Sequence, residues 1–387
     1  MAQKVLILST YEKAGGAAIA ASRLKTALQK AGVEVSMLCR ENINPLCLPR
    51  EGSKLLASLR AKLEKQSWTS IMERVLIWVL NGFSTKDLWA TDIALFGQDI
   101  TKTKEYKEAD VIHLHWVNQG FISLGGVRRF IKDGKKVVWT MHDAWNAMGA
   151  YHLAIQREET FLERWTWKRK IWLYSQNRIQ FVACSEWLKD EAESSPLMWS
   201  LRIKSIPNPI DTELFTPKRP NDRTTERPNR ILFVAQNVDN PMKGMQYLDE
   251  AVKTMKGSEA LEVIALGRDI PYIDNEEEMV RLYQSVDAFV LPSLSENLPN
   301  TIMEAMACGV PCVGFKVGGI PEMIDHKENG YVAQLKDVND LAEGIRYVLA
   351  PANHERLARA AREKVRRCYS EEAVAKRYVE VYIQDKA

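Results

Sequence analysis

Short apolar runs alternate along the chain with longer segments whose apolar residues recur at helical spacing. This alternation predicts parallel sheets built from strand-helix-strand units. The short runs are continuously apolar, which is typical of strands covered on both faces, so we expect an α/β protein with doubly wound sheets. The predicted strands are Lys4–Ser9, Glu34–Cys39, Val111–Trp116, Lys136–Met141, Gln180–Ser185 and Ile203–Ile206 in the first half, and Ile231–Ala235, Leu261–Leu266, Ala288–Leu291 and Pro311–Phe315 in the second.

A proline-rich stretch, Pro207–Arg230, separates the two sets of strands and has little apolar periodicity. Such a stretch is typical of a domain boundary, and a chain of 387 residues is long enough for two domains. We expect a first Rossmann-like domain at residues 1–207, a linker at 208–230, a second Rossmann-like domain at 231–368 and a C-terminal helix at 369–387. The helix itself is predicted over Glu371–Asp385, in a position from which it can pack back across the cleft between the domains.

Composition and charge narrow the class of protein. Apolar residues make up 46% of the chain and charged residues 27%, as in globular proteins. The 53 basic and 50 acidic residues give a formal charge of +3, which does not indicate a nucleic-acid partner. The halves differ, because the 30 basic and 23 acidic residues up to Pro217 give +7 and leave −4 for the remainder.

The lengths of the apolar runs and the spacing of the cysteines indicate in which cellular compartment the protein lies. The run Val75–Leu80 is far shorter than the roughly 20 residues of a spanning helix, and Val5–Leu8 is too short for a secretory core. The cysteines form no C-x-x-C pair, which favours reduced thiols over disulfides or a zinc cluster. We therefore expect a cytoplasmic protein without a metal site. The cysteines are Cys39, Cys47, Cys184, Cys308, Cys312 and Cys368.

Two segments of the first half, Glu51–Asn81 and Arg164–Trp172, are both basic and rich in apolar or aromatic residues. Such surfaces can lie on an anionic membrane face or accept a lipid-linked substrate. The simpler interpretation is a surface helix with a packed apolar stripe and a solvated basic face. In Glu51–Asn81 the basic residues are Lys54, Arg60, Lys62, Lys65 and Arg74, and the apolar ones include Leu55, Leu56, Leu59, Leu63, Trp68, Ile71 and Trp78.

Loops that follow strands are the first places to look for chemistry, because ligands of doubly wound sheets bind beyond the carboxyl ends of the strands. Gly15 and Gly16 follow the first strand and open the predicted helix Ala17–Lys30, so backbone can approach an anionic ligand there. A glycine pair before a helix also occurs by chance. His142 follows a strand end directly and can bond a hydroxyl or serve as a base, although a lone histidine is often structural.

Histidines also alternate at the end of the third predicted strand. His113 and His115 point to one face of a strand, as two metal ligands would. No third ligand is spaced to complete a metal site, so we interpret them as packed strand histidines.

Two loops of the second half have anion-binding character. One runs from the strand at Leu291 to a helix predicted to begin near Asn300, with Glu296 in the loop and Glu304 in the helix. Glu304 also fits a capping box with Thr301, three residues earlier. In the other loop, Lys243 is placed at a helix start to add a point charge to a diphosphate, although single lysines are more often solvated surface residues.

Several motifs together resemble the retaining nucleotide-sugar glycosyltransferases of family 4. They are Pro292–Glu296 with Glu304–Val313, Gly318–Glu322, His113–Trp116, Thr140–Trp145, Trp165–Lys170 and Pro207–Phe215. The first-half motifs are similar to a branch common in bacterial surface-polysaccharide loci. The resemblance covers nearly the whole chain and implies the GT-B fold, two facing Rossmann-like domains with the active site between them and the acceptor on the N-terminal side.

The resemblance also implies roles for particular residues. Glu296 bonds hydroxyls of the donor sugar, Glu304 the ribose, and Lys243 neutralises the departing diphosphate. His142 touches the donor sugar near the reacting carbon. Backbone amides of Asn297, Leu298, Asn300 and Thr301, together with Gly15 and Gly16, approach sugar, phosphate or acceptor. No D-x-D triplet occurs, which agrees with metal independence. No cofactor is implied beyond a nucleotide-sugar substrate, UDP- or GDP-linked, and the acceptor is a glycan or lipid-linked hydroxyl.

The chain departs from the family pattern in three places. Ala235-Gln236 stands where many relatives carry Gly-Arg, and Arg268 is the candidate substitute for the missing cation. No cysteine-bearing insert follows the His-Asp motif, because Tyr151-His152 runs quickly into the next helix. The span Leu266–Glu276 is short for the family.

Two other functions remain open at this stage. A sugar-nucleotide epimerase of similar scaffold would consume donor without an acceptor, and a non-catalytic sugar-nucleotide-binding partner in an assembly complex would bind nucleotide and release none. A nicotinamide enzyme is disfavoured, because no strand is followed by G-x-G-x-x-G with a distal acid.

Overall fold

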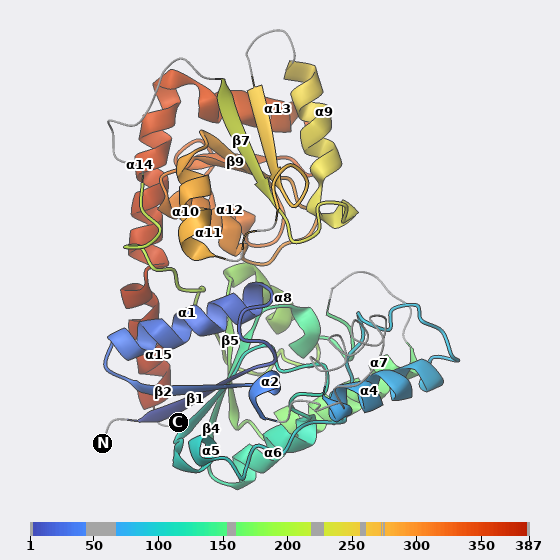
Figure 1. Ribbon diagram of the computed structural model, residues 1–387. Coiled ribbons are helices and arrows are strands. Elements are labelled where there is room, and N and C mark those ends of the chain that lie inside the picture. The colour runs from blue at the N-terminus through green and yellow to red at the C-terminus, as the bar shows by residue number, and fades with distance from the viewer. Residues whose placement is uncertain are drawn as a thin grey trace, which may run out of the picture. The chain divides into compact units, whose positions relative to one another are not determined.

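The computed structural model describes residues 3–43, 67–152, 160–217, 228–255, 261–271, 273 and 275–384. The chain divides into two compact units, one made of Met1–Ile206 with Ala375–Ala387 and the other of Pro207–Val374. Each unit is a parallel β-sheet with helices packed against it (Figure 1).

The sheet of the first unit is parallel throughout, in the order β2-β1-β3-β4-β5-β6. The order reverses between β1 and β3, so the loops after these two strands flank a switch point. The strands are β1 (Lys4–Ser9), β2 (Glu34–Cys39), β3 (Val111–Leu114), β4 (Lys136–Met141), β5 (Ile179–Ala183) and β6 (Ile203–Ser205). The helices are α1 (Gly16–Lys30), α2 (Arg40–Ile43), α4 (Trp68–Leu80), α5 (Lys104–Glu108), α6 (Leu124–Lys132), η1 (Ala144–Asn146), α7 (Phe161–Tyr174) and α8 (Glu186–Ser194).

The sheet of the second unit is also parallel, in the order β11-β10-β9-β7-β8, and its switch point lies between β7 and β9. Its strands are β7 (Asn229–Val234), β8 (Leu261–Leu266), β9 (Ala288–Leu291), β10 (Cys312–Phe315) and β11 (Gly330–Ala333). The helices are η3 (Pro241–Lys243), α9 (Met245–Met255), α10 (Glu276–Gln284), α11 (Asn300–Ala307), α12 (Ile320–Met323), α13 (Val338–Leu349), α14 (Pro351–Cys368) and α15 (Glu371–Ile383).

All the predicted strands are present, and the doubly wound α/β fold is confirmed. Strand β11 was not predicted, because four residues that begin with glycine carry too little apolar pattern to separate a strand from a loop. Strand β3 ends at Leu114, earlier than expected, so His115 lies beyond the strand in the loop that follows it.

The segment expected to be a linker is partly packed. The structure divides the chain after Ile206, and the described residues that follow belong to the second unit. Ile210 and Phe215 are buried there, Ile210 forms a bridge with Ser370, and Arg362 donates to the Phe215 carbonyl at 2.5 Å. Apolar side chains in this proline-rich stretch find a core because α14 and α15 return to it, which local composition does not reveal.

The simpler interpretation of Glu51–Asn81 is wrong where it can be checked. Residues 51–66 lie outside the described residues, and the rest form α4. In α4 the basic Arg74 is buried, whereas Trp68 and Trp78 are exposed. The basic side chain is buried because backbone carbonyls and Asp92 accept its N–H groups.

The C-terminal helix belongs to both units, since the residues from Ala375 onward are part of the first. Tyr382 Oη lies 2.7 Å from His113 Nδ1, and His113 Nε2 lies 2.8 Å from Thr140 Oγ1. Thr140 Oγ1 is in turn 2.9 Å from Tyr378 Oη. Burial lowers the pKa of His113 to about 3, so the ring is neutral and each nitrogen has one partner. The interpretation of His113 as a packed strand histidine is confirmed.

We predict that Tyr382→Phe lowers the free energy of unfolding by about 1–3 kcal/mol, because it leaves one buried ring nitrogen of His113 without its partner. Tyr347→Phe is the matched control, since the Tyr347 hydroxyl donates to the Lys327 carbonyl at the surface. Urea unfolding of both variants measures the difference. Equal losses in the two variants would contradict the assigned role.

Candidate functional site

The switch point of the second unit brings Lys243 and Glu296 together. Lys243 ends η3 in the loop after β7, and Glu296 lies in the loop after β9. Lys243 Nζ is 2.6 Å from Glu296 Oε1, and both side chains remain partly accessible to solvent. The positive end of the helix dipole stabilises a nearby carboxylate, but that carboxylate would repel an anionic ligand, and the Lys243 ammonium group offsets its charge. The structure therefore places a partly exposed cation and a partly exposed carboxylate at one edge of the sheet.

Backbone contacts hold these loops in register. Leu294 N donates to the Met242 carbonyl at 2.8 Å, and Gly319 N donates to the Asn297 carbonyl at 2.8 Å. Gly244 and Gly318 have φ values of +77° and +55°, and a Cβ on either would overlap a carbonyl of the Pro292–Glu296 segment. Only glycine fits such positions without strain. The loops after β7, β9 and β10 therefore form one preorganised surface.

Helix α11 begins at Asn300, as predicted, but the capping-box interpretation of Glu304 is wrong. The N-cap residue is Pro299 and no side chain caps the helix, so Thr301 lies inside the first turn. Glu304 is nearly buried, and its Oε2 accepts a hydrogen bond from Tyr283 Oη at 2.9 Å. A helix start without a side-chain cap suits an anionic ligand.

Of the other predicted residues of this unit, Leu298 and Asn300 lie at that helix start, whereas Arg268 follows a different strand. Leu298 is buried, and Asn300 Oδ1 accepts from Asn208 Nδ2 at 3.0 Å. Arg268 follows β8 and pairs with Asp249 at 3.4 Å and with Asp269 at 3.1 Å. The structure thus brings Lys243 and Glu296 together, while the ion pairs of Arg268 are with two other carboxylates.

In the first unit, the predicted glycine loop lies beside the switch point. Gly15 is the N-cap of α1 with φ +88°, and no side chain caps this helix start either. The loop is anchored behind the glycines, where Thr10 Oγ1 donates to the Asn118 carbonyl at 3.0 Å and Tyr11 stacks on Trp116. Gly16 is the first residue of the helix, so backbone amides at the end of β1 are presented at the edge of the sheet.

His142 pairs with His115 beyond the ends of β3 and β4. His115 Nδ1 lies 2.9 Å from His142 Nε2. Burial lowers the pKa of His142 to about 4, against a smaller opposite effect of Asp143, and burial also holds the pKa of His115 well below its usual value. Both rings are therefore neutral near pH 7. His142 can exchange a hydrogen bond with a hydroxyl but carries no positive charge.

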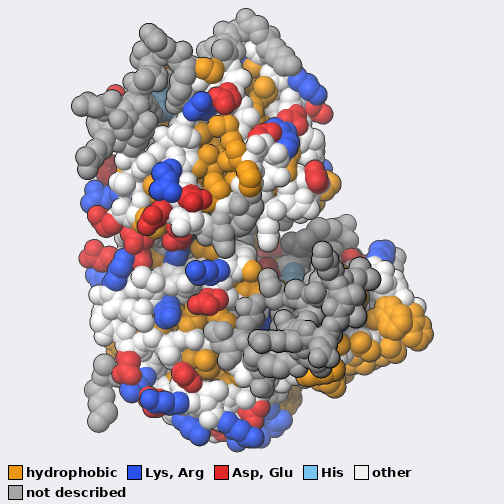
Figure 2. Space-filling model, viewed as in Figure 1, with side chains coloured by type: hydrophobic (Ala, Val, Ile, Leu, Met, Phe, Trp, Pro, Cys, Tyr) orange, Lys and Arg blue, Asp and Glu red, His pale blue; other side chains and the backbone are white. Residues whose placement is uncertain are grey.

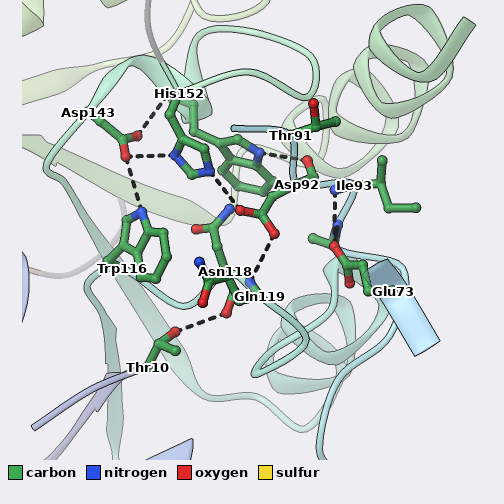
Figure 3. Close-up of polar contacts among 12 residues, drawn as sticks. Thr10, Glu73, Thr91, Asp92, Ile93, Trp116, Asn118, Gln119, Asp143 and His152 are labelled. Atoms are coloured by element: carbon green, nitrogen blue, oxygen red, sulfur yellow. Dashed lines mark hydrogen bonds and ion pairs between the residues drawn. The ribbon is translucent and has the colours of Figure 1, made fainter. Parts of the chain in front are cut away.

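A charged cluster next to this pair was missed by the sequence analysis. His152 lies between two carboxylates, with Nδ1 2.7 Å from Asp143 Oδ2 and Nε2 2.8 Å from Asp92 Oδ2 (Figure 3). Trp116 Nε1 donates to Asp143 at 3.1 Å, and Gln119 N donates to Asp92 at 3.1 Å. No local pattern links Asp92 to His152, because 60 residues separate them. The one sequence feature that could have indicated this cluster was Asp143, which directly follows His142 in the same motif.

The charge of His152 is stabilised by its two neighbours. Burial disfavours the imidazolium, but Asp143 and Asp92 outweigh it and raise the pKa of His152 to about 10. The same pairing holds the pKa of Asp143 below its usual value, although burial opposes it. Arg74 donates to the other oxygen of Asp92 and ties this cluster to α4.

We predict that stability falls as the pH rises from about 6.5 to about 10, because the folded state keeps a proton on His152 that the unfolded state has lost. The contribution is complete below the unfolded pKa and disappears above the folded one. One proton corresponds to about 1.4 kcal/mol per pH unit. Urea unfolding across this range should show the slope in the natural protein and a shallower slope in His152→Gln. Parallel profiles would contradict the assignment.

Comparison with solved structures identifies the fold. Sucrose-phosphate synthase from Thermosynechococcus elongatus is similar over 98% of both chains, with a TM-score of 0.65 and 17% identity. The Anabaena protein HepE, solved in complex with UDP and glucose, is similar over 98% of this chain and 99% of its own, with a TM-score of 0.60 and 16% identity. These likenesses, together with the two parallel-sheet Rossmann-like units, show that the chain has the GT-B fold.

Sequence comparison identifies the family. The profile of Glycosyltransferase Family 4 matches residues 14–214, more than half of the chain, and that of Glycosyl transferases group 1 matches residues 228–351. The chain therefore belongs to glycosyltransferase family 4. A glycosyltransferase of Methanocaldococcus jannaschii whose function is uncharacterised is 29% identical over 241 residues, which are 54% of this chain and 61% of that protein. The chain spans less than two thirds of the length of the curated relatives it matches.

Proposed function

We propose that this glycosyltransferase moves a sugar from a UDP- or GDP-sugar to a hydroxyl group of a glycan or lipid-linked acceptor, with retention of configuration and without a metal ion, in the assembly of a surface polysaccharide. The observation that carries the proposal is the pairing of Lys243 with Glu296 at the switch point, beside the uncapped start of α11. A sugar diphosphate requires a positive charge and amide dipoles for its phosphates, and a carboxylate for the hydroxyls of its sugar. Lys243, the start of α11 and Glu296 supply these three features.

The donor would bind the second unit in a defined orientation. Its diphosphate lies against the first turn of α11 and attracts Lys243, which then releases the Glu296 oxygen that it contacts in the free protein. Glu296 becomes available to accept hydrogen bonds from sugar hydroxyls. Glu304, already fixed by Tyr283, accepts from the ribose. Donor binding therefore replaces one ion pair by two sets of contacts.

A solved structure of the same fold, with a nucleotide sugar bound, supports a nucleotide-sugar donor. HepE was also crystallised in complex with UDP-glucose, and it shares the fold of this chain. The absence of a D-x-D triplet from the sequence supports a reaction in which side chains and backbone amides, in place of a divalent ion, stabilise the leaving diphosphate.

The chemical step would proceed on one face of the sugar. The bond between the anomeric carbon and the phosphate oxygen breaks, and the acceptor oxygen bonds to that carbon from the same side. The acceptor proton passes to an oxygen of the departing phosphate. Charge accumulates on the diphosphate, where each preorganised donor contributes about 3–4 kcal/mol. The first unit would hold the acceptor, with Gly15 and Gly16 near the phosphates and neutral His142 bonding a hydroxyl near the reacting carbon.

We predict that Lys243→Ala lowers the rate of nucleotide release from the preferred donor by at least about a hundredfold, because the leaving diphosphate loses its point charge. The donor is first selected by thermal shift among UDP-, GDP-, ADP- and dTDP-sugars, since a ligand at 100 times its Kd adds about 2.7 kcal/mol of stability. Lys253→Ala, an exposed lysine of α9, is the control and should retain the full rate. An unchanged rate in Lys243→Ala would refute the role.

We predict that Glu304→Ala weakens nucleotide binding by at least about tenfold, since a charged hydrogen bond contributes about 1.5–3 kcal/mol. Tyr283→Phe distinguishes a binding role of Glu304 from a structural one. It removes the hydroxyl that contacts Glu304 and leaves the carboxylate in place. Calorimetric titration with the free nucleotide should show near-normal affinity for Tyr283→Phe. Similar losses of affinity in both variants would make Glu304 a structural residue.

A further inference from the structure

Helix α4 is inverted relative to an ordinary surface helix. Its polar residues Ser70, Glu73 and Arg74 are buried, while much of its apolar side is exposed. Glu73 Oε1 accepts from Ile93 N at 3.1 Å and Ala94 N at 2.9 Å. Backbone groups and Asp92 therefore hold the inner side of α4, through Glu73 Oε1 and the terminal nitrogens of Arg74, and the outer side presents the apolar residues to the surroundings.

The outer side is a continuous apolar face. We define the α4 face as the exposed residues of this helix and the turn after it, which Figure 2 shows as hydrophobic side chains gathered over α4. Trp78 packs edge-on against Phe83, with ring centroids 4.9 Å apart, so the turn extends the same surface. The exposed members are Trp68, Met72, Val75, Trp78, Val79, Leu80 and Phe83. A face of this kind on a monomer normally marks a binding surface.

Helix α7 adds charge of one sign beside this face. Ile77 of α4 packs with Leu162 and Trp165 of α7 in one hydrophobic cluster. The single acidic residue of α7, Glu163, points inward and accepts from Gly149 N and Ala150 N, each at 2.5 Å.

Every acidic side chain of α4 and α7 is thus buried, and the exposed charges of these two helices are basic, at Arg164 and Lys168. An uncharged apolar face next to exposed basic side chains is complementary to an anionic surface.

We propose that the α4 face is a docking surface for an anionic lipid bilayer, with α4 lying in the plane of the interface. Tryptophan and phenylalanine at both ends of an aliphatic stretch suit the boundary between headgroups and acyl chains. The buried polar side of α4 holds the helix against the protein, so only one side enters the lipid. None of the helices in the described part of the chain is long and apolar enough to cross a membrane. This inference does not depend on the proposed reaction.

Vesicle co-sedimentation of the full chain tests the surface. Vesicles containing phosphatidylglycerol should bind the natural protein, and vesicles of phosphatidylcholine alone should bind it less. The double variant Trp68→Ser with Leu80→Ser should lower the partition coefficient by at least about tenfold. The matched control is Trp199→Ser with Leu335→Ser, because Trp199 is 71% exposed against 67% for Trp68, and Leu335 is 44% exposed against 43% for Leu80.

Charge is tested separately. Lys168→Glu should weaken binding to the anionic vesicles, and Lys253→Glu, a reversal in the other unit, should not. Circular dichroism checks that all variants are folded, which their exposure leads us to expect. The proposal is overturned if the natural protein ignores anionic vesicles, or if both double variants lose binding equally. It is also overturned if light scattering shows a dimer that Trp68→Ser with Leu80→Ser dissociates while vesicle binding persists, because the face would then bind a second copy.

Discussion

The reversal of strand order in the two parallel sheets is the constraint on which the candidate chemistry depends. All strands of a parallel sheet end at one edge, and where the order reverses, the two neighbouring loops leave in opposite directions and open a space between them. The reversal lies between β1 and β3 in the first unit and between β7 and β9 in the second. The glycine loop follows β1, while Lys243 and Glu296 follow β7 and β9. In the second unit this topology brings the loops of Lys243 and Glu296 into contact, although they are distant in sequence.

Buried charge sets the local structure of the first unit. Arg74, Asp92, His152 and Asp143 form a chain of ion pairs in which each desolvated charge has a partner of opposite sign. Such chains are sensitive to the loss of one member, because the charge left behind has neither water nor a partner. Since Asp143 follows His142 directly, the same chain positions the histidine pair at the end of β4. It also draws the polar side of α4 inward, which turns the apolar side outward.

Electrostatics in the second unit follow a different principle. An acidic side chain near a helix start that is suited to phosphate would repel such a ligand, and here Lys243 offsets the charge of Glu296. The loops are held by backbone hydrogen bonds and by close approaches at Gly244 and Gly318, so the groups are in place before a ligand binds. Membership in glycosyltransferase family 4 is consistent with this arrangement, and the proposed reaction would use these backbone dipoles and the Lys243 ammonium group to stabilise a leaving diphosphate.

The sequence by itself determined every strand except β11, the two-unit α/β fold, the family and the loops that carry Gly15, His142, Lys243 and Glu296, because apolar periodicity and short motifs are local properties. Tertiary structure decided what depends on distant partners. Pro299 takes the N-cap position of α11, which leaves Thr301 without a capping role, and the return of α14 and α15 packed the segment at Ile210. The pairing of Asp92 with His152 across 60 residues, and the burial of Arg74 in place of Trp68, also required the folded chain. Burial and pairing are set by which segments meet in space, and that information is not contained in the spacing of residues along one segment.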